Sequence, residues 1–412
     1  MRRPLIIERA GVISSRLLLP RRALWEGSLR SFQPPRPALR WCEMMPRVFV
    51  TDGAYKHSLA AVRALSSAGY RVTVGEREGL TSSRVLSFWS RHCAQTFRYP
   101  DPRRSPEATA AALAEHFSAA HYDAAIPVGL VMVELFVQHR DRFTVPLMLP
   151  PADSFAIAGD KRLTFAHASG LGIPIPRTLP AESWKELPPP LVFKHHKAGA
   201  LVARNEPEAA AYARDLGEAI NDYIVQEFIP GQNGFGYFAI FREGREAGYF
   251  MHERLMQHPK EGGPSVVARA IRNTRLHELG RTVLESLRWH GVAMVEFKRS
   301  DRDGEFYLIE VNPKLWGSLD LAIQSGCNFP VWIVRSLADP DAPITNGYRE
   351  GLTYQWIIPS GVQSFVRYPE LRMQLLQNVL SLRVRTDLRI TDPMPAAAGI
   401  WSGVRALLTR HS

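Results

Sequence analysis

The feature that most constrains this chain is a pair of glutamates, each set inside an apolar segment. Glu296 lies within residues 292–297 and Glu310 within residues 307–312. Both segments are rich in β-branched and aromatic residues, as strands are. The three-residue turn 302–304 separates the segments and ends in glycine, which favours a hairpin.

The register of this hairpin decides whether the two acids meet. If the turn pairs Asp301 with Glu305, then Glu296 lies directly opposite Glu310. Asn312 falls on the same face as Glu310, because side chains alternate along a strand with a period of two. The sequence therefore predicts three oxygen-bearing side chains on one face of the hairpin.

Two facing carboxylates repel each other, and burying them is costly unless positive charge lies between them. Two carboxylates and an amide oxygen are a set that Mg²⁺ accepts when phosphates complete its coordination shell. Two alternatives stay open. In the first, each carboxylate pairs with a nearby arginine or lysine instead of a metal. In the second, a four-residue loop shifts the register of the hairpin. The metal interpretation is favoured because three oxygen ligands converge on one face.

Composition excludes several classes of protein. The chain has 412 residues, with 45% hydrophobic and 22% charged, which is the balance of a soluble globular protein of two to four domains. Its longest apolar stretch, residues 124–137, contains Pro127 and Glu134 and predicts a buried strand and helix rather than a membrane span. The three cysteines have no metal-binding spacing and cannot all pair, which fits a reducing compartment.

The net charge of +11 is concentrated at the two ends of the chain. Residues 1–45 carry +6 and residues 363–412 carry +4, which leaves only +1 on the remainder. A nucleic-acid-binding protein needs its basic groups clustered on a folded surface. The sequence therefore predicts no nucleic-acid partner.

The first folded region, residues 46–150, has the pattern of a parallel crossover unit. A strand at 48–50 is followed by a helix that Ser58 is expected to cap, and then by a strand at 70–74. Apolar runs at 124–128 and 145–149 are expected to continue the sheet. Of the dinucleotide motif Gly-x-Gly-x-x-Gly only Gly53 is present, so a crossover domain without a dinucleotide is predicted.

From residue 151 onward the pattern changes to helices mixed with antiparallel hairpins. Asp160 is expected to cap a helix over 161–169, and residues 191–193 form a strand that ends at Lys194. The other predicted elements are helices at 206–219 and 276–289, strands at 223–229, 236–241 and 246–252 in one antiparallel sheet, and the hairpin 292–311.

Only 8 of the 51 basic residues are lysines. Lys161 follows the capping aspartate and Lys194 ends a strand, so both are placed to reach phosphates as point charges. For either lysine alone a solvated side chain is the simpler interpretation. Residues 226–231 pass from a strand into a turn, where an exposed backbone edge suits an adenine ring with Phe228 beside it; a plain strand end is the equal alternative.

The order of these segments is more specific than any one of them, and it resembles the ATP-grasp superfamily. The resemblance covers about residues 46–330 and looks most like an uncharacterised branch of carboxylate–amine ligase-like members. The segments that carry it are Gly159-Asp160-Lys161, Val192-Phe193-Lys194, Gln226-Glu227-Phe228-Ile229-Pro230-Gly231, Glu296 and Glu310-Val311-Asn312-Pro313-Lys314, with Glu253-Arg254-Leu255, Gly262-Gly263-Pro264-Ser265 and Leu315-Trp316-Gly317-Ser318 supporting the branch.

The resemblance implies a role for each matching residue. It implies that Lys161 and Lys194 bind the ATP phosphates and that Glu296, Glu310 and Asn312 bind magnesium. Lys314 would steady the transferring phosphate or the acyl phosphate, and Arg254 and Ser265 are expected near the carboxylate substrate. The adenine hinge matches Gln226, Glu227, Phe228 and Ile229, with Gln226 where Glu is frequent. Asn233 stands where an acid usually binds the ribose, and the loop 195–199 is poorer in glycine than usual.

The resemblance also implies an architecture. It predicts an N-terminal Rossmann-like domain at 46–150 and a two-part ATP-grasp domain with antiparallel sheets at 151–330, divided into 151–220 and 221–330. A basic leader at 1–45, disordered or the result of an upstream start, precedes these domains. A helical basic extension at 331–412 follows them.

The implied activity is that of an ATP- and Mg²⁺-dependent (or Mn²⁺-dependent) ligase, in which a carboxylate becomes an acyl phosphate and is joined to an amine or similar nucleophile. The partners would be small molecules and the location cytoplasmic. The alternative is an ATP-binding regulatory or vestigial protein without turnover, which the changes at Asn233 and in the loop motivate. A helix predicted over 371–384 has apolar and arginine side chains suited to an anionic membrane surface. Packing on the protein body is the favoured interpretation of that helix.

Overall fold

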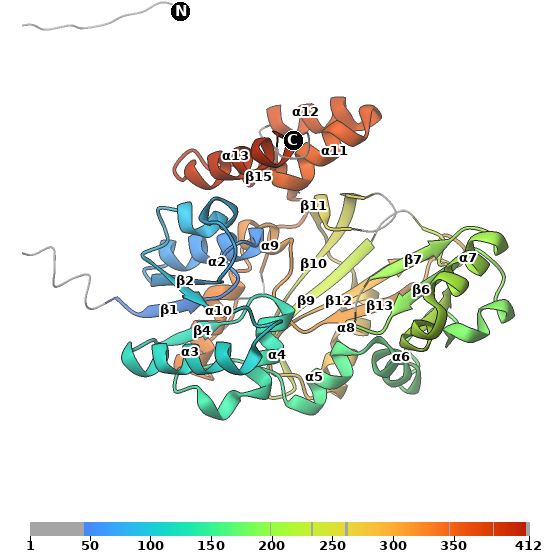
Figure 1. Cartoon of the computed structure of the whole chain (residues 1–412), viewed down its shortest axis with the longest axis horizontal. Coiled ribbons are helices and arrows are strands. Elements are labelled where there is room, and N and C mark those ends of the chain that lie inside the picture. Colours follow the sequence, from blue (N-terminus) through green and yellow to red (C-terminus); the bar gives the residue numbers. More distant parts are fainter. Residues whose placement is uncertain are drawn as a thin grey trace, which may run out of the picture. The chain divides into compact units, whose positions relative to one another are not determined.

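The computed structural model describes residues 45–197, 199–231, 234–259, 263–345, 347–381 and 383–408. In these residues the chain forms a mixed α/β structure with three sheets, one parallel and two largely antiparallel (Figure 1). The predicted leader lies outside the described residues, except for Met45. No helix in the described ranges has both the length and the apolar character that crossing a membrane requires.

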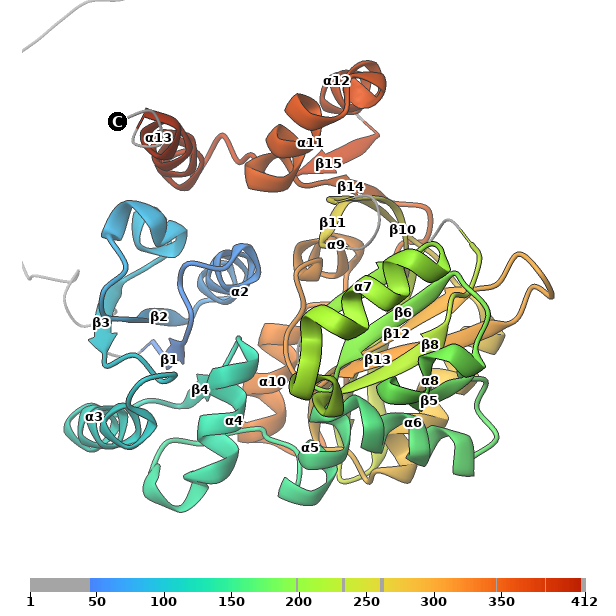
Figure 2. The ribbon, with the colours of Figure 1, turned by 45° about the vertical axis from the view of Figure 1, so that its right-hand side comes forward.

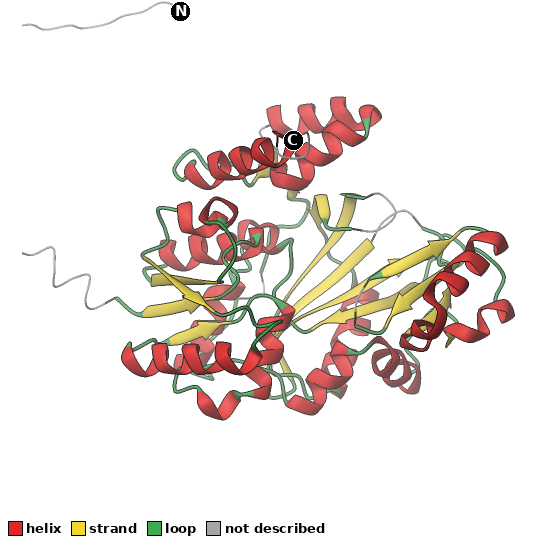
Figure 3. Cartoon of the chain, viewed as in Figure 1, coloured by secondary structure: helices red, strands yellow, loops and turns green. Residues whose placement is uncertain are grey.

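The first sheet is parallel and has the strand order β3-β2-β1-β4, as a crossover unit predicts. Alternating side chains of β1 divide its core. Val48 and Val50 pack towards α2, whereas Phe49 packs towards α3 and α4. Helices therefore cover both faces of the sheet (Figure 3). The elements are β1 (Arg47–Val50), α2 (Lys56–Ser67), β2 (Arg71–Arg77), β3 (Gln95–Tyr99), α3 (Pro106–Ala119), β4 (Ala124–Ile126) and α4 (Leu130–Gln138).

Two local predictions in this region are wrong. Ser58 does not cap α2, because the helix already begins at Lys56. The Ser58 hydroxyl instead reaches back to the carbonyls of Asp52 (2.7 Å) and Thr51 (3.2 Å) and ties the helix to the loop after β1. The apolar run 145–149 does not form a strand of the sheet, and it contributes only an isolated bridge between Leu147 and Ala125.

The second sheet is small and antiparallel, with the order β5-β8-β6-β7. Residues 223–229 were expected to share a sheet with the strands at 236–241 and 246–252, and that expectation is wrong. Gln226 of β8 pairs with Val192 and Thr178 in the small sheet instead. The elements are β5 (Thr178–Pro180), β6 (Leu191–His195), β7 (Ala200–Ala203), α7 (Glu206–Leu216) and β8 (Tyr223–Glu227).

The third sheet has seven strands in the order β13-β12-β9-β10-β11-β14-β15. One face, with Tyr237 and Val295, packs in a core that includes α8 residues. The opposite face, with Phe238, packs on Trp316, α9 and α10, in a core that also holds β1 and α2 residues. The elements are α5 (Ala152–Gly159), α6 (Lys161–Gly170), β9 (Gly234–Arg242), β10 (Arg245–Gln257), β11 (Ser265–Ala270), α8 (Thr274–Ser286), β12 (Gly291–Arg299), β13 (Phe306–Asn312), α9 (Leu319–Ser325) and α10 (Phe329–Ala338). Figure 2 shows the small sheet beside β12 and β13.

A helical extension was expected after residue 330, and the region holds two short strands beside its helices. Two short strands in that region, β14 and β15, extend the seven-stranded sheet. The helix expected over 371–384 ends at Leu380, because Val384 pairs with Thr353 as part of β15. The elements are β14 (Thr353–Gln355), α11 (Val362–Arg367), α12 (Arg372–Leu380), β15 (Val384–Thr386) and α13 (Met394–Leu408).

A buried aspartate fastens the C-terminal segment to the parallel-sheet region. Asp392 is 2% exposed and accepts hydrogen bonds from Arg63 Nε (2.8 Å), Ser90 Oγ (2.7 Å) and the Arg91 amide (3.0 Å). Burial would raise the pKa of Asp392, but these donors outweigh it and hold the pKa below its usual value. The carboxylate is therefore charged at neutral pH.

Candidate functional site

The hairpin of β12 and β13 pairs Glu296 with Glu310, as the sequence predicted. The predicted turn is nevertheless wrong by one residue. The Ser300 amide bonds to the Glu305 carbonyl at 2.9 Å, so the loop has four residues rather than three. A β-bulge further along the strand compensates, because Phe297 pairs with Leu308 and Ile309 is the extra residue. The bulge returns the two glutamates to direct opposition.

The bulge also connects the hairpin to the small sheet. The Lys194 ammonium, on β6, donates to the carbonyl of the bulged Ile309 at 3.3 Å. Lys194 is 6% exposed and its ammonium lies 5.2 Å above the centre of the Phe165 ring. Burial lowers the pKa of Lys194 to about 8, and nearby Glu310 opposes that shift. The lysine thus stays mostly protonated at neutral pH, in a place where a further negative charge would stabilise it.

Glu296 is paired with an arginine that reaches it from two strands away. The Arg254 guanidinium, on β10, donates through Nη2 to Glu296 Oε2 at 2.6 Å. The intervening strand β9 has Gly236 opposite Glu296 and Gly234 opposite Lys298, so no side chain blocks the way. This ion pair realises one of the alternatives that the sequence left open, since an arginine neutralises the first carboxylate.

Glu310 is held by an amide and by a lysine. Asn312 Nδ2 donates to its Oε1 at 2.6 Å, and Lys161 Nζ lies 3.9 Å from its Oε2. Burial alone would raise the pKa of Glu310, but Lys161, the Asn312 hydrogen bond and Lys194 together lower it below its usual value. The carboxylate is therefore ionised at neutral pH. The Asn312 amide oxygen remains as an acceptor beside it.

Lys161 owes its position to the helix start that the sequence predicted. Asp160 accepts a hydrogen bond from the Arg162 amide at 2.8 Å and caps α6, which begins at Lys161. The Lys161 amide itself donates to the His196 carbonyl at 3.0 Å, beside the loop that follows β6. The first turn of α6 therefore brings this lysine to the hairpin.

Lys314 completes the ring of cations. Burial lowers its pKa, and the charges of Glu310, Asp52 and Glu296 oppose that shift, so all three carboxylates lie near it. Counting Lys161, Lys194, Arg254 and Lys314 against Glu296, Glu310 and Asp52 leaves an excess of one positive charge. Such a site suits a polyanion that brings its own divalent cation.

The residues fit a metal only together with a second ligand. In the described ranges no group of three or more His, Cys, Asp or Glu side chains is arranged to hold a metal ion. The hairpin offers two carboxylates and one amide, and Mg²⁺ is commonly held by one or two carboxylates with phosphates supplying further oxygens. The donor set is therefore suited to a metal that arrives with a phosphate-bearing ligand.

Gln226, at the end of β8, presents a buried hydrogen-bond acceptor. Its Nε2 donates to Thr178 Oγ1 at 2.7 Å, and that hydroxyl donates in turn to the Pro176 carbonyl at 2.7 Å. The Thr178 hydroxyl can only accept from Gln226, so the amide orientation is fixed. The Gln226 Oε1 is buried with no partner in the part of the chain described, and an exocyclic amino group would satisfy it.

The rest of the predicted hinge is anchored to the hairpin loop. Glu227 accepts from the Arg177 amide (3.0 Å) and from Arg302 Nη2 (3.1 Å), so its carboxylate is already occupied. The Lys298 ammonium lies 4.3 Å from the centre of the Phe228 ring. Ile229 is buried. The sequence analysis missed Lys298, although its place two residues after Glu296 puts it on the same strand face.

Other predicted residues are not brought to this site. Ser265 starts β11 opposite Gln257, three residues along β10 from Arg254, which is about 10 Å of strand. Its carbonyl accepts a hydrogen bond from Lys56 at 3.2 Å, and the sequence had not singled out Lys56. Asn233 lies outside the described residues, as do Ala198 of the loop 195–199 and Gly262.

Residues 256–358 match the family model described as ATP-grasp in the biosynthetic pathway with Ter operon. No curated protein matches the chain.

Three solved structures are similar to most of the chain. The biotin carboxylase domain of Hydrogenobacter thermophilus 2-oxoglutarate carboxylase, with MgADP, ADP and bicarbonate, has a TM-score of 0.59 and 15% identity, over 75% of this chain and 73% of that one. An L-amino acid ligase from Bacillus licheniformis has a TM-score of 0.57 and 15% identity, over 71% of this chain and 74% of that one. A phosphoribosylglycinamide synthetase from Anaerococcus prevotii has a TM-score of 0.53 and 16% identity, over 75% of this chain and 79% of that one.

The structure has the ATP-grasp fold. It combines a parallel crossover sheet, a small antiparallel sheet and a larger sheet whose charged groups face the small one. The match of residues 256–358 to an ATP-grasp family model agrees with that fold.

Proposed function

We propose that this protein is an ATP- and Mg²⁺-dependent ligase that activates a carboxylate as an acyl phosphate and joins it to an amine or a similar nucleophile. The observation that carries the proposal is the opposition of Glu296 and Glu310 within a ring of four cations drawn from separate elements. The fold supports it, and so do the MgADP and ADP bound in the similar carboxylase structure.

The chemistry requires activation because a carboxylate has no usable leaving group. Transfer of the terminal phosphate of ATP to the carboxylate oxygen makes phosphate the leaving group, and a neutral amine then attacks the carbonyl carbon and expels it. Charge builds up on the transferring phosphate, so fixed cations around it lower the barrier. The excess positive charge of the site meets this need.

Each residue has a role in this proposal. Lys161 and Lys194 hold the phosphates, Lys314 steadies the transferring group, and the free Oε1 of Gln226 accepts a hydrogen bond from the adenine amino group. Glu296, Glu310 and Asn312 would hold Mg²⁺, which supplies charge neutralisation and orients the phosphates.

The Arg254–Glu296 ion pair has a particular consequence for this proposal. If Glu296 were to hold Mg²⁺, the metal would compete with Arg254 for its carboxylate, and the ion pair would open. Arg254 is then left without its partner in a largely buried position, where an unpaired charge is costly. A substrate carboxylate provides the replacement partner, which places the acid to be activated beside the phosphate site.

An ATP-binding regulatory or vestigial protein without turnover is the alternative, and one assay separates the two. The protein is incubated with ATP, Mg²⁺ and pooled carboxylates and amines, and ADP and phosphate are measured. The proposal expects release that depends on the substrate pool. Glu310→Ala should abolish it at an unchanged unfolding transition, whereas Glu305→Ala, at the turn end of the same hairpin, should retain it. Wild-type turnover in Glu310→Ala would reject the proposed site, and nucleotide binding without turnover would favour the alternative.

A further inference from the structure

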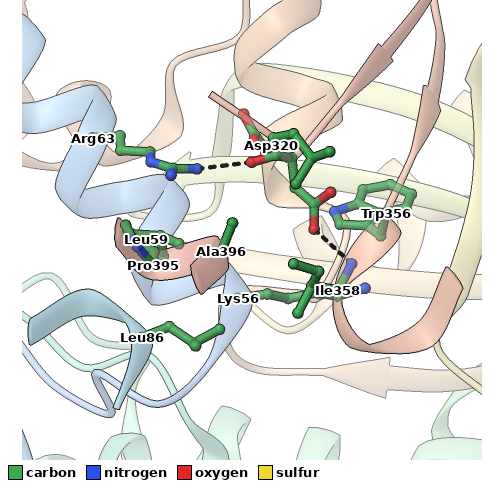
Figure 4. Close-up of a pocket in the computed structure, with 12 residues that line it drawn as sticks. Lys56, Leu59, Arg63, Leu86, Asp320, Trp356, Ile358, Pro395 and Ala396 are labelled. Atoms are coloured by element: carbon green, nitrogen blue, oxygen red, sulfur yellow. Dashed lines mark hydrogen bonds between the residues drawn. The ribbon is translucent and has the colours of Figure 1, made fainter. Parts of the chain in front are cut away.

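Helix α13 of the C-terminal segment is seated closely on the parallel-sheet region. Pro395 and Ala396 of α13 line the same small space as Leu59 and Leu86 (Figure 4). The cavity left there measures about 20 Å³, which is room for about one water molecule. This boundary is therefore a packing interface.

Helices α11 and α12 of the same segment are seated differently. They lie on the outside of the molecule, beyond β14 and β15 (Figure 2). The sequence favoured packing of this helical region on the protein body, but within α12 only Leu375 is buried. Its side chain packs with Met256, Val266 and Val267, and its carbonyl accepts a hydrogen bond from Gln355 Nε2 at 3.2 Å. Leu375 thus anchors α12 to the seven-stranded sheet.

The other apolar side chains of α12 face the solvent. Leu380 is 82% exposed and Met373 is 66% exposed. By comparison, no large apolar side chain before residue 362 is more than 48% exposed in the described part of the chain. The exposed positions recur at intervals of three or four residues, so they form one stripe along the helix. This apolar stripe consists of Met373, Leu376, Val379 and Leu380.

Arg372 joins α11 and α12 into one surface. Its Nε donates to the carbonyl of Phe365 at 2.8 Å, and its Nη2 donates to the carbonyl of Val366 at 3.4 Å. Val362 and Val366, four positions apart on α11, add two further exposed apolar side chains. We call these two valines and the apolar stripe the α11–α12 surface.

The charges around the α11–α12 surface are almost all positive. Residues 362–386 contain four arginines and a single acid, Glu370. All four arginines are exposed, and none forms an ion pair within the part of the chain that the structure describes. They are Arg367, Arg372, Arg383 and Arg385. The surface is therefore both apolar and cationic.

This combination decides what can cover the surface. Residues 1–45 carry +6, and a second copy of the chain would bring the same four arginines, so either would place like charges together. A nucleic acid would compensate the arginines but leave the apolar stripe in water. The surface of an anionic phospholipid bilayer meets both needs, because its headgroups attract arginine and the boundary of its acyl chains accepts apolar side chains.

We propose that the α11–α12 surface holds this protein on the surface of an anionic phospholipid membrane. Helix α12 lies along the membrane plane, with its apolar stripe at the boundary between headgroups and acyl chains. The four arginines bind the phosphates of the headgroups. This proposal does not depend on the proposed ligase function.

Sedimentation of the full chain with lipid vesicles tests the proposal. One set of vesicles contains phosphatidylcholine alone, and in the other about a third of the lipid is phosphatidylglycerol. The protein should bind the anionic vesicles at least about tenfold more tightly than the neutral ones at low salt. Salt at about 0.5 M should weaken that binding, because it screens the arginines.

Two pairs of substitutions separate the apolar contribution from the charged one. Met373→Gln with Leu380→Gln, and separately Arg383→Gln with Arg385→Gln, should each weaken binding to the anionic vesicles by at least about tenfold. These four side chains are exposed, so the unfolding transition should be retained in both variants.

Matched substitutions elsewhere serve as controls. Leu171→Gln with Leu201→Gln removes two exposed leucines, and Arg103→Gln with Arg104→Gln removes two exposed arginines. Binding by each control variant should stay within about twofold of the wild type. Loss of binding in both α11–α12 variants but in neither control supports the proposal.

Three outcomes overturn it. Binding that is absent, or equal for the two kinds of vesicle, excludes an anionic membrane and favours an acidic protein as the occupant. Binding that the α11–α12 variants leave unchanged belongs to another part of the chain, such as residues 1–45. A dimer of the lipid-free protein that Met373→Gln with Leu380→Gln converts to a monomer, measured by sedimentation velocity, assigns the surface to self-association instead.

Discussion

Replacing Lys194 by methionine should change how the stability of the protein depends on pH. Lys194 is 6% exposed, and burial lowers its pKa from 10.5 to about 8. Between those two values the lysine of the unfolded chain binds a proton that the folded protein does not bind. The unfolded state then carries more protons, so the free energy of unfolding rises with pH across this window.

The magnitude follows from the size of the shift. Each pH unit within the window adds about 1.4 kcal/mol, so the whole shift corresponds to roughly 3 kcal/mol. Between pH 8 and pH 9.5 the wild type should therefore gain about 2 kcal/mol relative to Lys194→Met. Below pH 8 both states bind the proton and the difference between the two proteins should be constant.

Urea unfolding at pH 7.5, 8.5 and 9.5 measures this difference directly. Other titrating groups, including Lys56 with its similar pKa, contribute equally to both proteins and cancel. Lys185→Met, at an exposed lysine, is the control and should follow the wild type at each pH. A gap between wild type and Lys194→Met that stays constant or narrows as the pH rises would refute the reasoning.

Three further outcomes are expected. Gly280→Ala should destabilise the protein by about 1–3 kcal/mol in urea unfolding, because the new methyl group would overlap the Tyr237 ring. Gly170→Ala, where no atom lies within 4 Å, should be neutral or stabilising by up to about 1 kcal/mol, and equal effects at the two glycines would contradict the packing. Arg254→Met should lower the free energy of unfolding by about 3 kcal/mol, because Glu296 is left buried without its cation. Adding Glu296→Gln should restore most of that loss, and if the effects of the two substitutions simply add, the pair is not coupled. Mn²⁺ followed by electron paramagnetic resonance should bind at least about tenfold more weakly without nucleotide than with it, and equal affinity would argue against a site completed by phosphate.

The hairpin shows what alternation along a strand can and cannot predict. The assumed turn register placed Glu296 opposite Glu310, which is the pairing found, and the period of two placed Asn312 on the same face as Glu310. The prediction succeeded although its turn was wrong by one residue. The bulge at Ile309, whose carbonyl accepts a hydrogen bond from Lys194 of another sheet, leaves no mark in the apolar pattern of the sequence.

The sequence predicted least well which distant strands pair with one another. The strand at 223–227 was predicted as a strand, but its sheet was not, because nothing local distinguishes Val192 from Gly236 as a neighbour. The short strands β14 and β15 were missed for a similar reason, since three residues carry almost no periodic signal. Helix starts were predicted correctly in one case and wrongly in another. Asp160 was recognised as a cap from its own residue type, whereas Ser58 has the same chemistry and serves another purpose.

Within the candidate site, sequence order predicted the lysines and glutamates but not their partners. Arg254 was expected beside a substrate and is found on Glu296, a contact that exists because two glycines of β9 leave space. Lys298 was not predicted, and neither was Lys56, which binds the Ser265 carbonyl from 209 positions away in the sequence. Such pairs become visible only when the fold closes.

The contacts of Asp392 have a consequence for how this protein is made. Arg63 is translated early, yet its ion-pair partner follows 329 residues later. While the ribosome is still adding the intervening residues, helix α2 lacks that partner. The parallel sheet can assemble during synthesis from its own segments, but its contacts with the tail form only after those last residues have left the exit tunnel.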